Sequence, residues 1–257
     1  MRIATFNVAG IRARLPRLLD WLDSTRPDVV CLQEIKTVDD GFPALEIESR
    51  GYHCAVHGQK GFNGVAILSQ RPLADVRTGL PGDDGDEQAR FIEATVAGVR
   101  IAGLYLPNGN PVPGPKFDYK LAWMDRLIAH ARHALDSEQP YVLAGDFNVC
   151  PADEDVWDPR RMADDALCQP ESRQRFRRLL GLGFTDAIRA VQPTGRAYTF
   201  WDYQGGAWAK DWGLRIDHLL LSPPAADRLE AAGIDRTTRA LEKASDHVPA
   251  WCVLREP

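Results

Sequence analysis

Residues 141–148 read YVLAGDFN, an apolar run that ends abruptly in Gly145, Asp146 and Asn148. An uninterrupted apolar run of this kind is typical of a strand that is covered on both of its faces. Similar runs recur over residues 3–8, 29–32, 64–68, 91–96, 101–106 and 216–221, and residues 245–254 read as a loop that leads into a last strand. We therefore expect a core built on β-sheets.

Apolar residues recur at helical spacing between these strands. Leu15, Leu18, Leu19 and Leu22 follow the i, i+3, i+4, i+7 pattern of a helix. Two further helices are expected over residues 121–135 and from about residue 170 to Gly181 or Gly183. Residues 64–106 hold three strands with no helix between them, which indicates antiparallel pairing. The pattern predicts a mixed α/β (α+β) fold of layered sheets and helices.

The composition bounds the class of protein. Of 257 residues, 44% are hydrophobic and 26% are charged, and no linker-like segment is present, so we expect one globular domain over residues 1–257. The chain lacks an 18-residue apolar run and an apolar signal segment, which predicts a cytoplasmic protein with no membrane contact. A net charge of −5 argues against coating nucleic acid by bulk charge but allows a local phosphate site. Five cysteines without a CxxC pair predict neither a disulfide framework nor a zinc site.

Polar side chains follow the apolar runs at the points where the strands end. Carboxylate and amide oxygens are offered there by Glu34, Asp146, Asp217, Asp246, Asn7 and Asn148. Oxygen donors of this kind suit Mg²⁺, with Mn²⁺ as an alternative. Together with His247 and Tyr105, they point to metal-assisted hydrolysis of a phosphate ester.

Each of these residues also has an ordinary structural interpretation. A single glutamate at a strand end is commonly a solvated surface residue, and an Asp-His pair is commonly a hydrogen-bonded turn. A single tyrosine commonly lies at the edge of a core. The combination is the stronger signal, because unrelated turn residues have no reason to match one phosphoesterase set.

The order of the motifs resembles a known family. The matching segments are IATFNVAGIRAR (3–14), PDVVCLQEIK (27–36), KGFNGVAILS (60–69), GLYLPNG (103–109), LAGDFNVCP (143–151), YTFWDY (198–203), GLRIDHLLLS (213–222) and SDHVPAW (245–251). In these segments the chain is similar to the bacterial exodeoxyribonuclease III and abasic-site endonuclease family of the exonuclease–endonuclease–phosphatase superfamily. The resemblance implies a four-layered α/β sandwich, with two packed, mostly antiparallel sheets flanked by helices.

The resemblance also implies a role for each polar residue at the strand ends. Glu34 is expected to bind Mg²⁺ with Asn7 beside it, and Asp246 to lie at an outer metal position. Asp146 is expected to activate the attacking water, Asn148 to hold the phosphate, and Tyr105 to lie near the leaving oxygen. His247 is expected to contact the phosphate, with Asp217 orienting it. Further candidate metal ligands are Asp146, Asn148 and His247.

Two further groups of residues are expected to contact DNA. Backbone phosphates are assigned to Arg12, Asn108 and a glycine-rich loop with Lys60, Gly61 and Asn63. On its own, that loop would also read as a plain hairpin turn. A pocket for a flipped-out abasic sugar is assigned to Phe200, Trp201, Trp212, Leu214 and Ile216. Without the resemblance, these apolar residues would read as core packing.

The implied function is that of a Mg²⁺-dependent DNA repair nuclease that acts as a monomer on double-stranded DNA. It would cut 5′ to abasic sites, degrade strands from the 3′ end and remove 3′ phosphates or sugar fragments. An alternative is a phosphatase or phosphodiesterase of the same superfamily that acts on lipid or inositol phosphate. A non-catalytic nucleic-acid-binding module would be favoured by loss of Glu34, Asp146 or His247, and all of these are present.

Overall fold

The computed structural model describes residues 1–256, and strands form its centre. The strands are β1 (Arg2–Asn7), β2 (Val29–Gln33), β3 (His53–His57), β4 (Val65–Ser69), β5 (Ala74–Thr78), β6 (Phe91–Val96), β7 (Val99–Tyr105), β8 (Tyr141–Asp146), β9 (Thr185–Asp186), β10 (Asp217–Leu221), β11 (Leu229–Ile234) and β12 (Ala250–Leu254). The α-helices are α1 (Ile11–Thr25), α2 (Ala44–Glu48), α3 (Pro115–Leu135), α4 (Pro170–Gly181), α5 (Ala187–Val191), α6 (Ala207–Lys210) and α7 (Pro223–Ala226). Short 3₁₀ helices are η1 (Asp39–Gly41), η2 (Asp153–Asp155) and η3 (Arg236–Ala240).

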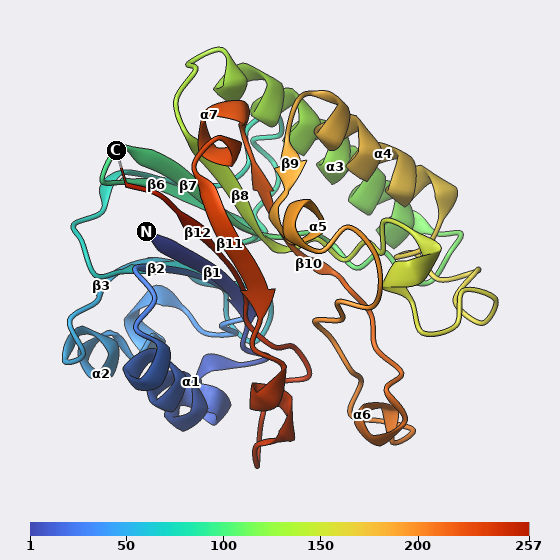
Figure 1. Cartoon of the computed structure of the whole chain (residues 1–257), viewed down its shortest axis with the longest axis horizontal. Coiled ribbons are helices and arrows are strands. Elements are labelled where there is room, and N and C mark those ends of the chain that lie inside the picture. Colours follow the sequence, from blue (N-terminus) through green and yellow to red (C-terminus); the bar gives the residue numbers. More distant parts are fainter. Residues whose placement is uncertain (257) are drawn as a thin grey trace.

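Two six-stranded sheets pack against each other (Figure 1). The strand order is β11-β12-β1-β2-β4-β3 in the first sheet and β5-β6-β7-β8-β10-β9 in the second. In each sheet the two central strands are parallel, and all other neighbours are antiparallel. The units β1–α1–β2 and β7–α3–β8 are therefore equivalent, each a parallel pair joined by a long helix.

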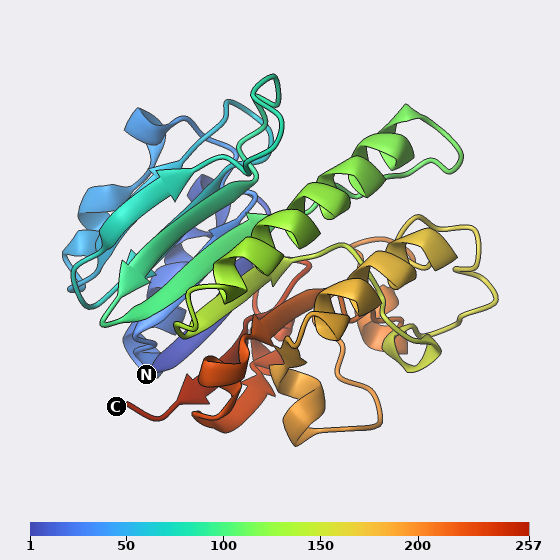
Figure 2. The ribbon, with the colours of Figure 1, turned by 90° about the horizontal axis from the view of Figure 1, so that it is seen from above.

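The core is divided by the sheets into layers. Between the sheets, Ile3 and Val29 of the first pack in one cluster with Ile101 and Val142 of the second. Helices α1 and α2 cover the outer face of the first sheet, and α3 and α4 cover the outer face of the second (Figure 1, Figure 2). The expected four-layered α/β sandwich with mostly antiparallel sheets is confirmed. Among residues 1–256, no helix is long and apolar enough to span a membrane.

The apolar pattern located the central strands but not the edges of the sheets. The edge strands are β11 and β3 in the first sheet and β5 and β9 in the second. β5 reads ADVRT and is exposed at every position, so it has no apolar run that would mark it as a strand. The helices also begin earlier than the apolar spacing indicated, with α1 starting at Ile11 and α3 at Pro115.

Candidate active site

Side chains from both sheets meet at one end of the sandwich. Asn7 ends β1, Glu34 follows β2, Asp146 ends β8, and His247 lies in the loop before β12. The Asn7 amide bridges the two sheets, because its Nδ2 donates to Glu34 Oε1 at 2.9 Å and to Asp146 Oδ2 at 3.0 Å. One potential ligand atom from each of Glu34, Asp146 and His247 lies within 4.8 Å of the others. Residues far apart in the sequence thus form one cluster.

Glu34 lies just beyond β2 in a left-handed backbone conformation, with φ 51°. Lys36 Nζ lies 2.8 Å from Glu34 Oε2, so the carboxylate has a cation beside it as well as the Asn7 amide. Burial alone would raise the pKa of Glu34, but the hydrogen bonds from Lys36 and Asn7 lower it below its ordinary value. Glu34 therefore offers anionic oxygen at neutral pH.

Asp146 is buried at the end of β8, where the chain turns sharply. Its Oδ1 accepts a hydrogen bond from the Asn148 backbone N–H at 2.9 Å, and Asn148 itself has φ 48°. Burial raises the pKa of Asp146 above the usual carboxylate range, although the nearby His247 opposes the shift. A carboxylate with a raised pKa is suited to accept a proton from water near neutral pH.

His247 and Asp217 form a buried pair. His247 Nδ1 lies 2.8 Å from Asp217 Oδ2, and its Nε2 lies 3.7 Å from Asp146 Oδ2. Burial alone would lower the pKa of His247, but Asp217 and Asp146 raise it to about 10. His247 is therefore an imidazolium at neutral pH, with an Nε2–H for an anion. His247 Nε2 faces Asp146, so the ring can meet a phosphate oxygen or a metal ion there, and its raised pKa favours the phosphate contact.

Tyr105, Asn108 and Asp246 complete the rim and line the same cavity as Asp146. Tyr105 ends β7 and is paired in register with Asp146 of β8. Burial and the neighbouring Glu34 carboxylate raise the pKa of Tyr105, so its hydroxyl stays protonated. Asn108 Nδ2 donates to Asn148 Oδ1 at 3.2 Å, which links the loops after β7 and β8.

A cavity of about 590 Å³ opens beside this cluster. Its polar lining includes Glu34, Asp146 and His247. The remaining lining is largely apolar and includes Trp157, Met162, Leu167, Phe200, Trp212, Leu214 and Ile216. Trp157 and Trp212 stack with ring centroids 4.4 Å apart, which stiffens this part of the wall. A phosphate bound at the polar lining would place its sugar against apolar side chains.

Trp201 does not line the cavity, which corrects its expected place in the pocket. Phe200 and Trp201 are neighbours in an extended segment, so their side chains point to opposite sides. Phe200 lines the cavity, and its ring centroid lies 5.0 Å from that of His247. Trp201 is instead fully buried in a cluster with Tyr198 and Val248. Trp201 is therefore a core residue.

The other residues expected to hold phosphates lie outside the cavity lining. Lys60 and Gly61 are exposed in the loop between β3 and β4. The Asn63 backbone oxygen accepts a hydrogen bond from the Lys36 N–H at 3.0 Å, which holds this loop beside the Glu34 segment. Arg12 is exposed and donates to the Gly41 carbonyl at 3.3 Å. Any contact that these residues make with DNA lies around the cavity rather than in it.

Sequence reasoning missed several residues at or behind the site, among them Lys36, the buried Lys120, Trp157, Met162 and Leu167. The last three lie in an irregular segment between β8 and α4, where no period marks which side chains face inward. Lys120 did leave a signal, because it is a lysine on the face of α3 that also holds the buried Trp123 and Met124.

The cluster at the cavity carries more negative than positive formal charge. Its carboxylates are Glu34, Asp146, Asp217 and Asp246, and its cations are Lys36, His247 and the buried Lys120, which donates to the Asn148 carbonyl. Such an excess of oxygen donors fits a divalent cation, and the chain's own cations do not neutralise it. The carboxylates of Glu34 and Asp146 are placed to hold one, with the His247 ring nearby. The expected place of Asn7 as a ligand is corrected, because its Nδ2 donates to both carboxylates and its Oδ1 accepts from the Ala9 N–H at 3.0 Å.

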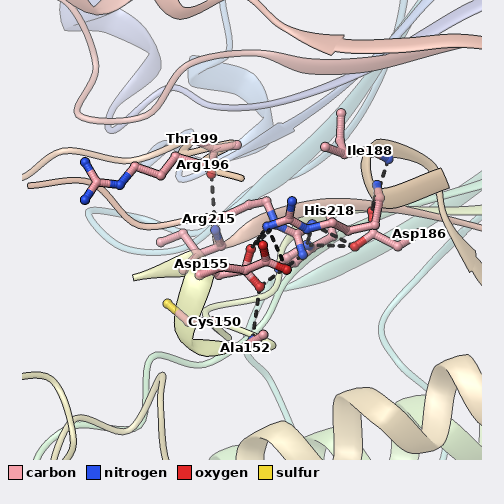
Figure 3. A network of polar contacts seen from close by, with 12 residues as sticks. Cys150, Ala152, Asp155, Asp186, Ile188, Arg196, Thr199, Arg215 and His218 are labelled. Atoms are coloured by element: carbon pink, nitrogen blue, oxygen red, sulfur yellow. Dashed lines mark hydrogen bonds and ion pairs between the residues drawn. The ribbon is translucent and has the colours of Figure 1, made fainter. Parts of the chain in front are cut away.

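A second buried charge network surrounds Arg215, which precedes β10 (Figure 3). Arg215 lies between two aspartates, with Nε 2.6 Å from Asp155 Oδ1 and Nη1 2.7 Å from Asp186 Oδ2. His218 Nδ1 accepts from Arg215 Nη1 at 3.0 Å, so its Nε2 carries the proton and donates to the Val149 carbonyl at 2.9 Å. The network thus holds β10, which carries Asp217, against the loop after β8.

Comparison with known proteins agrees with the geometry. A model described as the Endonuclease/Exonuclease/phosphatase family matches residues 4–247. Exodeoxyribonuclease III of Haemophilus influenzae is 35% identical over 263 residues, covering 98% of both chains. A 3′ phosphatase from Neisseria bound to a product DNA hairpin has a TM-score of 0.97 at 42% identity, and an AP endonuclease from Archaeoglobus fulgidus has 0.95 at 38%, each covering 99% of both chains. The predicted resemblance is confirmed, and the chain belongs to the Endonuclease/Exonuclease/phosphatase family.

Proposed function

We propose that this chain is a metal-dependent DNA repair nuclease that cuts 5′ to abasic sites and processes 3′ ends. The observation that carries the proposal is a single cavity lined both by the hydrolytic cluster of Glu34, Asp146 and His247 and by the apolar wall around Phe200 and Trp212. The relatives' names, an exodeoxyribonuclease, a 3′ phosphatase and an AP endonuclease, support DNA as the substrate.

In the proposed reaction, Asp146 orients a water molecule and accepts its proton. The raised pKa makes Asp146 a stronger base than an exposed aspartate. The water oxygen forms a bond to phosphorus while the bond from phosphorus to the 3′ oxygen breaks, and the leaving oxygen takes up a proton. The products are a 3′ hydroxyl and a 5′ phosphate.

The remaining polar residues stabilise the negative charge on the phosphate and keep the reacting groups in position during this step. The His247 imidazolium supplies an N–H to a phosphate oxygen, and Asp217 fixes the ring orientation through the 2.8 Å contact. Asn7 keeps the Glu34 and Asp146 carboxylates in place through its two hydrogen bonds. Asn148 lines the cavity beside Asp146, and we assign the second N–H of its amide to the same phosphate, since the first donates to the Leu106 carbonyl.

The proposal assigns Mg²⁺, with Mn²⁺ as an alternative, to the Glu34 side of the cluster. Asn7 touches Glu34, and Asp246 lines the same cavity. A bound divalent ion supplies positive charge for the negative charge that develops on the leaving oxygen. The excess of carboxylates over cations in the cluster supports this assignment.

The apolar wall accounts for the choice of an abasic sugar. Phe200, Leu214 and Ile216 offer no hydrogen-bond partner to the polar edge of a base, and Trp212 offers only its indole N–H, whereas a deoxyribose without a base has no such edge to satisfy. Around the cavity, backbone phosphates are assigned to Arg12, Lys60, Gly61 and Asn63, and a phosphate contact inside the cavity is assigned to Asn108. A single-domain monomer acting on double-stranded DNA completes the proposal.

The test compares three duplexes, each with Mg²⁺ and with a chelator. One duplex carries an abasic-site analogue, one carries a 3′ phosphate, and one is intact. We expect metal-dependent incision of the first and removal of phosphate from the second, both lost in Asp146→Asn. Trp212→Ala should impair abasic incision more than 3′-phosphate removal, because the second reaction needs no sugar pocket for a flipped nucleotide. If no duplex is cleaved, the DNA assignment is wrong and inositol phosphates become the next substrates to assay.

A further inference from the structure

Lys120 is a buried lysine that the proposed reaction does not use. It lies on α3 with no exposed surface, on the helix face that also carries the buried Trp123 and Met124. Its Nζ donates to the Asn108 carbonyl at 3.0 Å and to the Asn148 carbonyl at 2.5 Å. The hydrogen-bond partners of this amine are therefore two backbone oxygens rather than a carboxylate.

These two carbonyls belong to the two loops that leave the parallel pair β7 and β8. The loops are also joined directly, since Asn148 Nδ2 donates to the Leu106 carbonyl at 2.9 Å and Asn108 Nδ2 donates to Asn148 Oδ1 at 3.2 Å. Asn108 and Asn148 both line the cavity. Lys120 thus links the two loops from the side of helix α3, while the side chains of Asn108 and Asn148 line the cavity.

The loop after β7 is shaped to let the lysine pass. Gly109 has φ +92°, and a Cβ at this glycine would lie 2.6 Å from Lys120 Cδ. A side chain at residue 109 would therefore push the lysine stem away from both carbonyls. The absence of a Cβ at Gly109 and the buried amine at Lys120 are complementary features of one contact.

Burying an amine costs desolvation free energy, and a methionine of similar length would fill the same space at a lower cost. Burial lowers the pKa of Lys120 to about 7, while Asp146 and Asp165 favour the charged form. The amine has N–H donors for both carbonyls in either protonation state. The two hydrogen bonds to the Asn108 and Asn148 carbonyls therefore offset the cost of burying the amine.

We infer that Lys120 is a positioning residue that holds Asn108 and Asn148 at a fixed spacing, so that both amides reach the same substrate phosphate. The inference rests on the proposed function for its substrate. Misplacing the amides should weaken their contact with the phosphate most where charge builds up, in the transition state. Ground-state affinity for DNA depends mainly on contacts around the cavity and should change little.

The test compares Lys120→Met with Lys120→Arg and with Arg132→Met, which removes an exposed cation from the same helix. For abasic-duplex incision, we expect Lys120→Met to lower kcat by about 10- to 100-fold, as outer-shell substitutions commonly do, with KM nearly unchanged. Lys120→Arg, which keeps donors for both carbonyls, should recover much of the loss. Arg132→Met should match the wild type. A kcat for Lys120→Met within twofold of the wild type, or a loss confined to KM, would overturn the inference.

A second measurement separates this inference from the proposed function. In ¹⁵N-labelled protein, the side-chain amide resonances of Asn108 and Asn148 should shift or broaden in Lys120→Met, while those of Asn63 should stay as in the wild type. Unchanged resonances contradict the positioning role whether or not the wild type cuts DNA. If Lys120→Met does not fold, Lys120→Gln is compared by the same two measurements. Glutamine keeps an N–H donor, but its stem is too short to span both carbonyls, so it should show the same loss of kcat.

Discussion

His247 and His218 are both buried beside aspartates, yet they hold their protons differently. Burial opposes the charged form of each ring. Asp217 and Asp146 overcome it at His247 and raise its pKa to about 10. Burial and the neighbouring Arg215 guanidinium lower the pKa of His218 to about 4. The charge of the neighbours, and not the depth of burial, decides which histidine carries a proton at neutral pH.

Strand β10 separates the two environments. Leu219 and Leu221 pack between the sheets and Leu220 packs toward α3 and α4, so alternate residues face opposite sides. Asp217 accordingly meets His247 at the cavity, whereas His218 packs 4.7 Å from the Phe176 ring of α4. On the helix side, the charges of Arg215 and Arg189 balance those of Asp155 and Asp186. The cavity side keeps an excess of carboxylates, which suits it to binding a divalent cation and accepting a proton.

Removing the charged groups of the cavity side should have the largest effect. Asp146→Asn removes the proton acceptor, and His247→Asn removes the imidazolium, so each should lower kcat for abasic incision by about 10³-fold or more. Affinity for the uncut duplex should stay within a few-fold of the wild type. Single-turnover incision and fluorescence anisotropy measure the two quantities. Near-normal turnover of either variant would show that its assigned role is wrong.

Removing the central cation of the helix side should instead cost stability. Arg215→Met leaves Asp186 buried without its cation and leaves Asp155 with Arg189 alone, which should lower the free energy of unfolding by about 3–5 kcal/mol. Urea titration measures the loss. Arg177→Met, on the exposed side of α4, is the control and should change the free energy of unfolding little. A loss no larger than that of the control would mean that the network is not structural.

The difference between the two sides also marks what the sequence could predict. Asn7, Glu34 and Asp146 were predictable because each lies where an apolar strand ends, and these strand ends meet at one rim. The partners of Arg215 were not, because Asp155 and Asp186 are 60 and 29 residues away and no local pattern links them. The central strands were predictable in the same way as the rim.

Inside the cavity, the sequence predicted the segments better than the orientation of their side chains. Phe200 and Trp201 are equally apolar neighbours, and only the register of the extended segment decides which one faces the cavity. The wall residue Leu167 is placed by a long-range contact, since its carbonyl accepts the Cys150 N–H at 2.9 Å. Contacts of this kind depend on the assembled fold.

Acid should distinguish the two histidines through stability. The folded pKa of His218 is about 4, below the 6.5 of an ordinary histidine. As the pH falls from 6.5 toward 4, His218 is protonated in the unfolded chain but stays neutral in the folded chain. The contribution of neutral His218 to the free energy of unfolding is therefore lost in this range. The difference of 2.5 pKa units corresponds to about 3 kcal/mol. His218→Gln should lose less stability than the wild type between pH 7 and pH 4.5 in urea titrations, and an equal loss would contradict a neutral His218.

Added Mg²⁺ should stabilise the folded chain through the cavity side and not through the Arg215 network, and this is the smallest of the expected effects. The carboxylate excess beside Glu34 offers a site to a divalent ion, whereas the balanced network around Arg215 does not. At 10 to 100 times its dissociation constant, a ligand that binds only the folded chain adds about 1–3 kcal/mol to the free energy of unfolding. Glu34→Gln should lose most of this gain, and Arg215→Met should keep it despite its lower starting stability. Thermal unfolding with and without Mg²⁺ measures both. A full gain in Glu34→Gln would place the ion away from Glu34, and the excess charge of the cavity side would then need another partner.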